Sequence, residues 1–105
     1  MAGETFIAEI TTKLVAALHP DKVILFGSHA RGAAAPASDV DLLVVMRTSM
    51  PRPQRTRLAY SAVYPYSVPL DLLVCTPEEV SYWQDTPASL IAHVLREGKV
   101  LYERA

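Results

Sequence analysis

A Gly-Ser pair and three acidic residues are the residues of this chain whose types and spacing could do chemistry. Gly27 and Ser28 follow an apolar segment, Asp39 and Asp41 come soon after them, and Asp71 interrupts a later apolar run. A turn at Gly-Ser can present backbone N–H groups to an anion. Neighbouring carboxylates repel each other unless cations lie beside them, and oxygen ligands suit Mg²⁺ or Mn²⁺. The set therefore predicts metal-assisted phosphoryl chemistry.

Two apolar segments must position these groups. Residues 23–26 predict a strand that ends at the Gly-Ser pair in a turn, and the turn opens a short helix that runs to Gly32. Residues 40–46 predict a second strand. Since side chains alternate along a strand, Asp39 and Asp41 are expected on one face.

The rest of the chain alternates between helical and strand patterns. Helices and strands are expected, in chain order, at 4–18 (helix), 52–64 (helix), 68–75 (strand), from Pro77 onward (helix), from Pro87 to about Glu97 (helix) and 100–102 (strand). Thr76 is the predicted N-cap of the helix that begins at Pro77. This alternation predicts an α/β, or α+β, fold in a single domain over residues 1–105, a length typical of one domain.

Each motif also has an ordinary structural interpretation. Gly27 and Ser28 could form a common strand-to-helix turn, and Asp39 and Asp41 could be the solvated start of a strand. Asp71 is harder to explain in this way, because an unpaired carboxylate buried in an apolar run costs several kcal/mol. Its alternative is an outward-facing residue on an edge strand. The order and spacing of the three acids after the Gly-Ser pair favour the functional interpretation.

Other polar residues are weaker candidates. The planar fork of Arg31 could bind a phosphate, although an Arg at a helix end is more often a solvated cap partner. His29 could line the mouth of the site, but a role for it is not expected. Arg52, Arg55 and Arg57 are expected to form a solvated face that a partner could contact. Aromatic side chains are expected to pack in the core and at its rim: Tyr60, Tyr64, Tyr66, Tyr82 and Trp83.

Composition limits the partners and the compartment. The chain has 105 residues, is 50% hydrophobic and carries a net charge of −1 without a block of like charges. It lacks the clustered Lys and Arg that neutralise nucleic-acid phosphates, so no direct nucleic-acid partner is expected. The single Cys75 cannot form an internal disulfide, which agrees with a reducing compartment. Because no apolar run approaches ~20 residues and acidic Glu4 stands near the N-terminus, we expect a cytoplasmic protein without a membrane partner.

At three places the sequence resembles the nucleotidyltransferase superfamily that includes DNA polymerase beta. The segments are 25–32, which contains the Gly-Ser pair, 38–44, which contains Asp-x-Asp, and 71–74, which begins with the third acid. The closing segment 97–103 is similar to the end of the minimal branch of this superfamily, the MNT domain. The resemblance covers nearly the whole chain.

The resemblance implies a polymerase beta-like nucleotidyltransferase core, in which helices flank a mixed sheet. It implies two Mg²⁺ ions held by Asp39, Asp41 and Asp71. It also implies ATP as the donor, with its phosphates at Gly27, Ser28 and Arg31. Asp71 is the candidate to orient or deprotonate the incoming hydroxyl. Small members of this branch are typically encoded beside a HEPN-domain protein, commonly an RNase toxin. The resemblance therefore implies transfer of AMP to a tyrosine hydroxyl of a HEPN toxin, with this chain as the antitoxin.

Three other classes of protein compete with this interpretation. One is a catalytically weak or inactive module of the same fold that neutralises its partner by binding alone. A phosphatase or phosphoacceptor domain is disfavoured, because its Asp-x-Asp would follow an apolar strand, whereas here the acids precede residues 42–45. A purely structural subunit is disfavoured by the acid at Asp71.

Overall fold

The structure, a computed structural model, describes residues 2–32 and 39–104 of the chain. Four helices and four strands form within these residues. In chain order they are α1 (Ala2–Leu18), β1 (Lys22–Phe26), β2 (Val40–Val45), α2 (Arg52–Val63), β3 (Leu70–Cys75), α3 (Pro77–Trp83), α4 (Leu90–Glu97) and β4 (Lys99–Glu103). These bounds agree closely with the predicted elements, except at the start of α4 and in the short helix predicted after β1.

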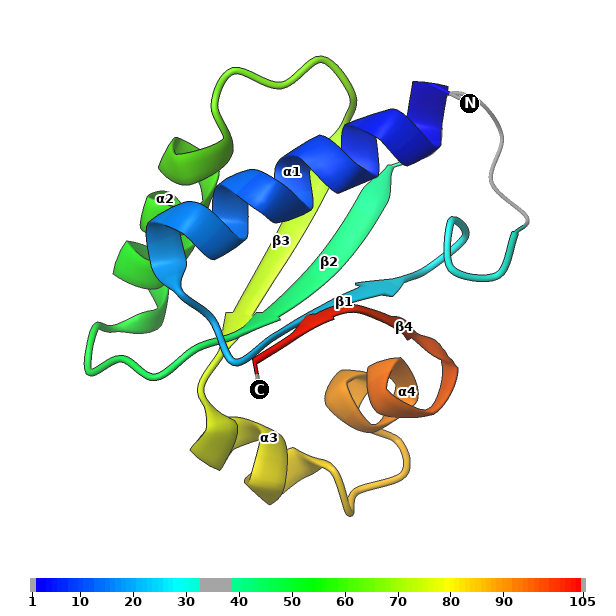
Figure 1. Ribbon diagram of the computed structural model, residues 1–105. Coiled ribbons are helices and arrows are strands. Elements are labelled where there is room, and N and C mark those ends of the chain that lie inside the picture. Colours follow the sequence, from blue (N-terminus) through cyan, green and yellow to red (C-terminus); the bar gives the residue numbers. More distant parts are fainter. Residues whose placement is uncertain (1, 33–38, 105) are drawn as a thin grey trace.

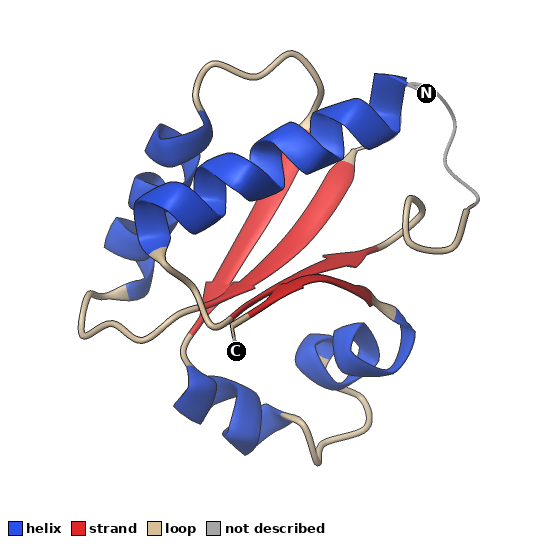
Figure 2. Ribbon diagram, in the orientation of Figure 1, coloured by secondary structure: helices blue, strands red, loops and turns tan. Residues whose placement is uncertain are grey.

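The four strands form one mixed sheet in the order β3-β2-β1-β4. β1 pairs antiparallel with β2 and with β4, whereas β2 pairs parallel with β3. The step from β2 to β3 passes through α2, the kind of crossover that a parallel pair requires. α1 and α2 cover one face of the sheet, and α3 and α4 lie on the other (Figure 1 and Figure 2). This arrangement confirms the predicted α/β fold with helices flanking a mixed sheet.

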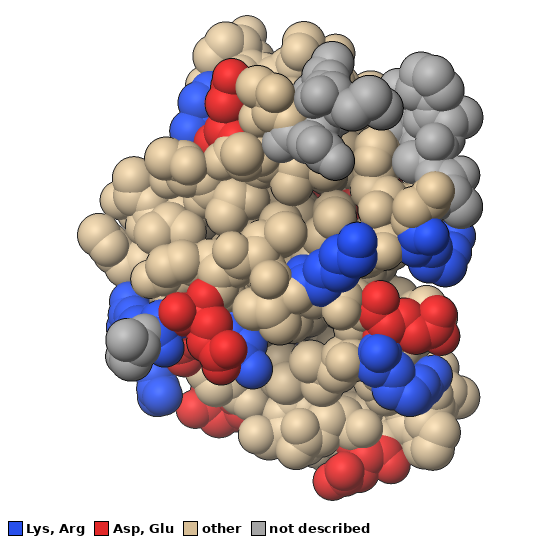
Figure 3. Space-filling view, turned by 45° about the vertical axis from the view of Figure 1, so that its right-hand side comes forward, with Lys and Arg blue, Asp and Glu red and all other residues tan. Residues whose placement is uncertain are grey.

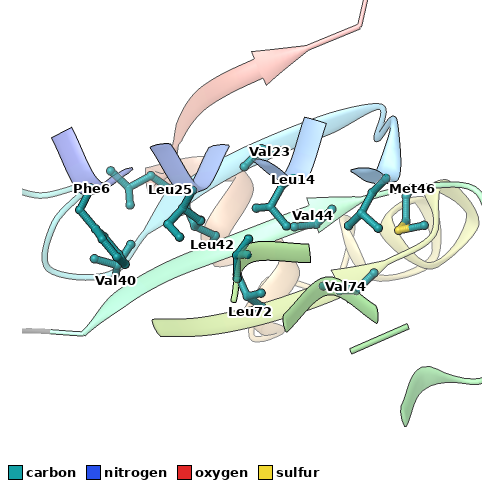
Figure 4. Packing of buried hydrophobic residues seen from close by; sticks show 14 of the residues in the cluster. Phe6, Leu14, Val23, Leu25, Val40, Leu42, Val44, Met46, Leu72 and Val74 are labelled. Atoms are coloured by element: carbon teal, nitrogen blue, oxygen red, sulfur yellow. The ribbon is translucent and has the colours of Figure 1, made fainter. Parts of the chain in front are cut away.

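Two apolar layers hold the helices to the sheet. Figure 4 shows the larger layer, in which Phe6 and Leu14 of α1 pack with Leu42 and Val44 of β2. The smaller layer joins the opposite face to α3 and α4, and its buried members are Ile24, Leu43, Val45, Cys75, Ile91 and Val94. Because side chains alternate along β2, Asp41 lies on the face of this smaller layer.

Arg55 departs from the solvated arginine face that the sequence predicts. Its side chain is buried, and its Nε donates to the Met50 carbonyl at 3.0 Å. Its Nη1 donates to the Val74 carbonyl at 3.4 Å and to Glu79 Oε1 at 2.7 Å. The guanidinium is therefore paired and hydrogen-bonded, which is the condition for burying a charge. It links α2 to β3 and α3, while the other two arginines of the group are exposed as predicted.

Capping residues explain where α3 and α4 begin. Thr76 caps α3 as predicted: its side chain accepts from the Glu79 N–H, and the Glu79 side chain accepts from the Thr76 N–H. The prediction that Pro87 opens the next helix is wrong, because α4 begins after Ser89. The Ser89 hydroxyl accepts a hydrogen bond from the Ala92 N–H at 3.1 Å, a capping role that proline cannot fill.

The surface of the described residues carries mixed charge. In Figure 3, basic and acidic side chains are interspersed over the visible face and do not gather into one basic area. This distribution agrees with the net charge of −1. Among the helices in the described part of the chain, none is long and apolar enough to cross a bilayer.

Candidate active site

The turn after β1 places the Gly-Ser pair at one end of the sheet. Gly27 has a φ of 75°, and its carbonyl accepts from the Ala30 and Arg31 N–H groups at 3.1 and 3.3 Å. Residues 28–32 form hydrogen-bonded turns, so the predicted short helix is wrong. Gly32 again has a positive φ, of 70°. A segment this short between two left-handed glycines is below the length at which a helix propagates.

The hydrogen bonds of the turn limit which amides could bind an anion. The N–H groups of Ala30, Arg31 and Gly32 donate to carbonyls inside the turn. A phosphate at this place would therefore meet the amides that precede Ala30, those of Gly27 and Ser28 among them. These are the two positions that the sequence singles out.

The carboxylate of Asp41 lies against the backbone of Gly27. Asp41 stands opposite Phe26, the last residue of β1, in the antiparallel pairing. A Cβ atom on Gly27 would lie 2.2 Å from Asp41 Oδ2 and 3.2 Å from its Cγ. Asp41 can hold this position only because residue 27 has no side chain. Glycine at this site meets two requirements, the positive φ and the close approach of the carboxylate.

Asp71 lies beside Asp41 on the neighbouring strand. The parallel register pairs the two residues, so both occupy the same face of the sheet. Asp71 is exposed, which contradicts the predicted burial. The reason is that β3 is an edge strand and Asp71 stands near its start. The alternative prediction, an outward-facing residue on an edge strand, matches this exposure.

Asp39 precedes β2 and is exposed. Only Asp41 of the Asp-x-Asp pair is therefore held within the sheet. The segment before Asp39 is rich in alanine and is expected to form a loop at 33–37. This segment and Ser38 lie outside the described residues.

The electrostatics of Asp41 indicates that the predicted site residues share one neighbourhood. Burial raises the pKa of Asp41 above its ordinary value, and the charges of Asp71 and then Asp39 raise it further. The charges of His29 and Arg31 lower the pKa of Asp41 and so oppose this shift. Because such effects weaken with distance and with solvent screening, Asp71, Asp39 and Arg31 lie close enough to Asp41 for their charges to act on it.

His29 is the neighbour of Asp41 for which the sequence predicts no role. Its side chain is half-buried in the turn, and its charge acts on the pKa of Asp41. Its position directly after Ser28 was the signal in the sequence that could have indicated a role. A side chain next to the Gly-Ser pair lies near the acid that the pair contacts.

The acids supply the donor atoms that a divalent cation prefers. Carboxylate oxygens suit Mg²⁺, and a cation would relieve the repulsion that raises the pKa of Asp41. Within residues 2–32 and 39–104, however, no three Asp, Glu, His or Cys side chains are gathered into a ready-made metal site. The predicted ligands Asp39, Asp41 and Asp71 fit a cation by their chemistry and neighbourhood, but their side chains would have to converge to hold it.

A separate charged hollow lies at the start of β1, the opposite end of the sheet from the Gly-Ser turn. Asp21, Lys22, Arg47, Glu103 and Arg104 line it. Its charges pair with one another, with Lys22 Nζ 3.4 Å from Glu103 Oε2 and Arg47 Nε 3.5 Å from Asp21 Oδ2. None of the predicted site residues contributes to this hollow.

Known proteins share both sequence and fold with this chain. The family described as polymerase beta, nucleotidyltransferase matches residues 8–105. A protein from Methanocaldococcus jannaschii, provisionally named a protein adenylyltransferase, is 33% identical over 88 aligned positions, which cover 78% of this chain and 58% of the relative. The chain thus spans little more than half the length of this curated relative.

Two solved structures resemble the fold. A provisionally named nucleotidyltransferase from Sulfolobus solfataricus superposes with a TM-score of 0.68 at 20% identity, over 95% of this chain and 79% of that protein. A toxin-antitoxin structure with AMP-PNP superposes with a TM-score of 0.65 at 22% identity, over 92% of this chain and 73% of the matched one. At these identities the likeness establishes a shared fold.

Proposed function

Because the chain belongs to the polymerase beta-like nucleotidyltransferase family, whose match spans residues 8–105, we propose that it transfers AMP from ATP to a hydroxyl group of a partner protein. The observation that carries the proposal is the contact of Asp41 with the Gly27 turn, with Asp71 in register beside it. A backbone suited to phosphate and two carboxylates thereby meet at one end of the sheet.

Two comparisons support the donor and the acceptor. The relative provisionally named a protein adenylyltransferase supports AMP as the transferred group and a protein as its acceptor. The toxin-antitoxin neighbour contains AMP-PNP, an analogue of ATP. In this proposal the partner is a toxin of the HEPN class, the acceptor is a tyrosine hydroxyl, and this chain is the antitoxin that neutralises the toxin by modifying it.

The residues of the turn would bind the triphosphate. N–H groups at Gly27 and Ser28 would hold its terminal phosphates, and the Ser28 hydroxyl could add a further hydrogen bond. Arg31 is exposed in the same turn, and its planar guanidinium suits a phosphate. Because the turn contacts Asp41, a triphosphate held here would lie next to the acids.

The transfer step forms one bond and breaks one. The acceptor oxygen attacks the α phosphorus of ATP, the bond from that phosphorus to the bridging oxygen breaks, and pyrophosphate leaves. Asp71 would accept the hydroxyl proton, because its exposed carboxylate stands at the sheet edge, where an acceptor can approach. AMP then remains on the partner.

Asp39, Asp41 and Asp71 would together hold the divalent cations, Mg²⁺ in this proposal. When bound, such cations stabilise the charge on the attacking and leaving oxygens. Asp41 is the ligand that the fold fixes most firmly, since it lies in β2 and fits against Gly27.

The intact mass of the partner tests the proposal. The protein encoded beside this chain is incubated with the chain, Mg²⁺ and, separately, each of the four ribonucleoside triphosphates. We expect the partner to gain AMP from ATP with the wild-type chain and not with Asp41→Asn. Asp85→Asn is the matched control and should keep full activity, because Asp85 is an exposed acid between α3 and α4.

The other outcomes of this experiment are equally informative. A tight complex without any gain of mass would contradict the proposal and favour a module of the same fold that neutralises its partner by contact alone. Gain of a different nucleotide would correct the donor and keep the reaction class.

A further inference from the structure

Tyr60 of α2 lies against the sheet edge where Asp71 stands. Its hydroxyl donates to the Leu70 carbonyl at 3.1 Å and accepts from the Leu72 N–H at 3.0 Å. These two backbone groups flank Asp71 on either side. A single hydroxyl group thus occupies the place of a missing neighbouring strand.

The pairing of β3 explains why these groups face outward. In a parallel pair, the backbone groups of alternate residues point to the neighbouring strand, and those of the residues between point away. The carbonyls of Pro69 and Cys75 accept from N–H groups of β2 and the residue after it. The groups of Leu70 and Leu72 therefore point away from β2, toward α2.

We propose that Tyr60 is a positioning residue for Asp71. By holding the peptide groups on both sides, its hydroxyl fixes the backbone from which the Asp71 side chain projects, on the face that also carries Asp41. The Tyr60 ring is partly buried and packs against the larger core layer, so the hydroxyl stands on a rigid base. This inference rests on the proposed function, in which Asp71 receives the acceptor proton.

A second contact along the same edge shows what is particular to Tyr60. Arg55 donates to the Val74 carbonyl, on the next outward-facing residue of β3. α2 therefore covers the edge of β3 with two polar side chains. Of these two, Tyr60 is hydrogen-bonded to the residues on either side of Asp71. Loss of its hydroxyl should affect the chemical step more than nucleotide binding.

Tyr60→Phe tests this inference because it removes the hydroxyl and keeps the ring. We expect kcat for AMP transfer to fall about tenfold or more, the size usual for residues that orient a metal-site ligand from outside. The KM for ATP should stay near the wild-type value, since Gly27 and Ser28 bind the phosphates. Tyr66→Phe is the matched control and should keep the wild-type kcat, because Tyr66 meets Tyr60 through its ring, with the centroids 6.2 Å apart.

An NMR measurement separates this inference from the proposed function. In Tyr60→Phe, and not in Tyr66→Phe, we expect a lower backbone order parameter at Asp71 and faster hydrogen exchange at the Leu72 amide. An unchanged order parameter at Asp71 in Tyr60→Phe would overturn the inference. So would a wild-type kcat in a Tyr60→Phe variant whose order parameter at Asp71 has fallen. If the wild-type chain transfers nothing, the proposed function fails, and the order parameter still decides whether Tyr60 fixes Asp71.

Discussion

The carboxylate of Asp41 occupies the space that a side chain on Gly27 would fill. A Cβ atom at residue 27 would lie 2.2 Å from Asp41 Oδ2. This contact places the turn after β1 directly against the acid of β2. The backbone that would bind a phosphate and the carboxylate that would bind a cation are therefore immediate neighbours.

Gly27→Ala is expected to displace Asp41 and to lower the transfer rate about a hundredfold, a loss typical of a misplaced catalytic group. Gly32→Ala is the matched control, because Gly32 has a φ of 70° against 75° at Gly27, but apart from its chain neighbours no atom of residues 2–32 and 39–104 lies within 4 Å of its Cβ position. Both alanines carry the strain of a left-handed backbone, about 1 kcal/mol. Melting temperature and rate should be measured for both, and equal rates would contradict the importance of the contact.

Asp41→Asn is expected to abolish transfer and to raise the melting temperature of the ligand-free protein by a few degrees at neutral pH. In the folded protein, burial and then the charges of Asp71 and Asp39 raise the pKa of Asp41 above its ordinary value of 3.8. The ionised carboxylate therefore destabilises the fold, fully above the raised pKa and not at all below the ordinary one.

The difference in melting temperature between Asp41→Asn and wild type should accordingly shrink as the pH falls through this range. Thermal denaturation from about pH 7 to about pH 3 measures it. A variant less stable than wild type at neutral pH would be evidence against this electrostatic account.

Single substitutions of the neighbouring charges should shift the pKa of Asp41 in a defined order. Asp71→Asn should lower it more than Asp39→Asn, because Asp71 contributes the larger of the two repulsions, and Arg31→Met should raise it. NMR titration of the Asp41 carboxyl carbon measures each shift, with Asp85→Asn as a control that should leave it unchanged. A larger effect from Asp39 than from Asp71 would disagree with the strand register.

Arg55→Met is expected to lower the free energy of unfolding by about 2–3 kcal/mol, because Glu79 and the Val74 carbonyl lose a buried partner. Arg52→Met is the control: Arg52 lies 3.5 Å from the same Glu79, but its side chain is 55% exposed against 9% for Arg55. Its loss should cost about 0.5 kcal/mol or less. Urea denaturation measures both variants, and similar losses would show that burial of Arg55 adds nothing.

The same ion pair sets a pH dependence for wild type. The hydrogen bond from Arg55 is the main cause that lowers the pKa of Glu79 below its ordinary value of 4.5. Its stabilising contribution is therefore complete above 4.5 and is lost as the pH falls through the lowered pKa. The difference between wild type and Arg55→Met should narrow at acidic pH.

Periodicity and capping residues predict most elements of this fold, because those signals are local. The order of strands in the sheet is not local, since it depends on contacts between distant segments. This is why the sequence predicts a buried Asp71. Leu70 and Leu72 are apolar because they face the layer under α1 and α2, while Asp71, between them, points to the other face at an exposed edge.

The residues of the candidate site are visible in the sequence, but the contacts among them are not. The contact of Gly27 with Asp41 depends on the antiparallel pairing of β1 with β2. Tyr60 carries no motif, because a tyrosine in a helix before a strand is ordinary. Its significance follows only from the position of its hydroxyl between Leu70 and Leu72.

The shared register of β2 and β3 also decides which changes of length this chain can accept. The connection from Val63 to Leu70 can gain or lose residues without changing how β2 pairs with β3. That pairing ends with Val45 opposite Cys75. One residue inserted or deleted within β3, beside Asp71, would shift the pairing register by one position. Asp71 would then move to the opposite face, among the side chains packed under α1 and α2. Insertions and deletions should therefore be tolerated in the connection and excluded from the strand.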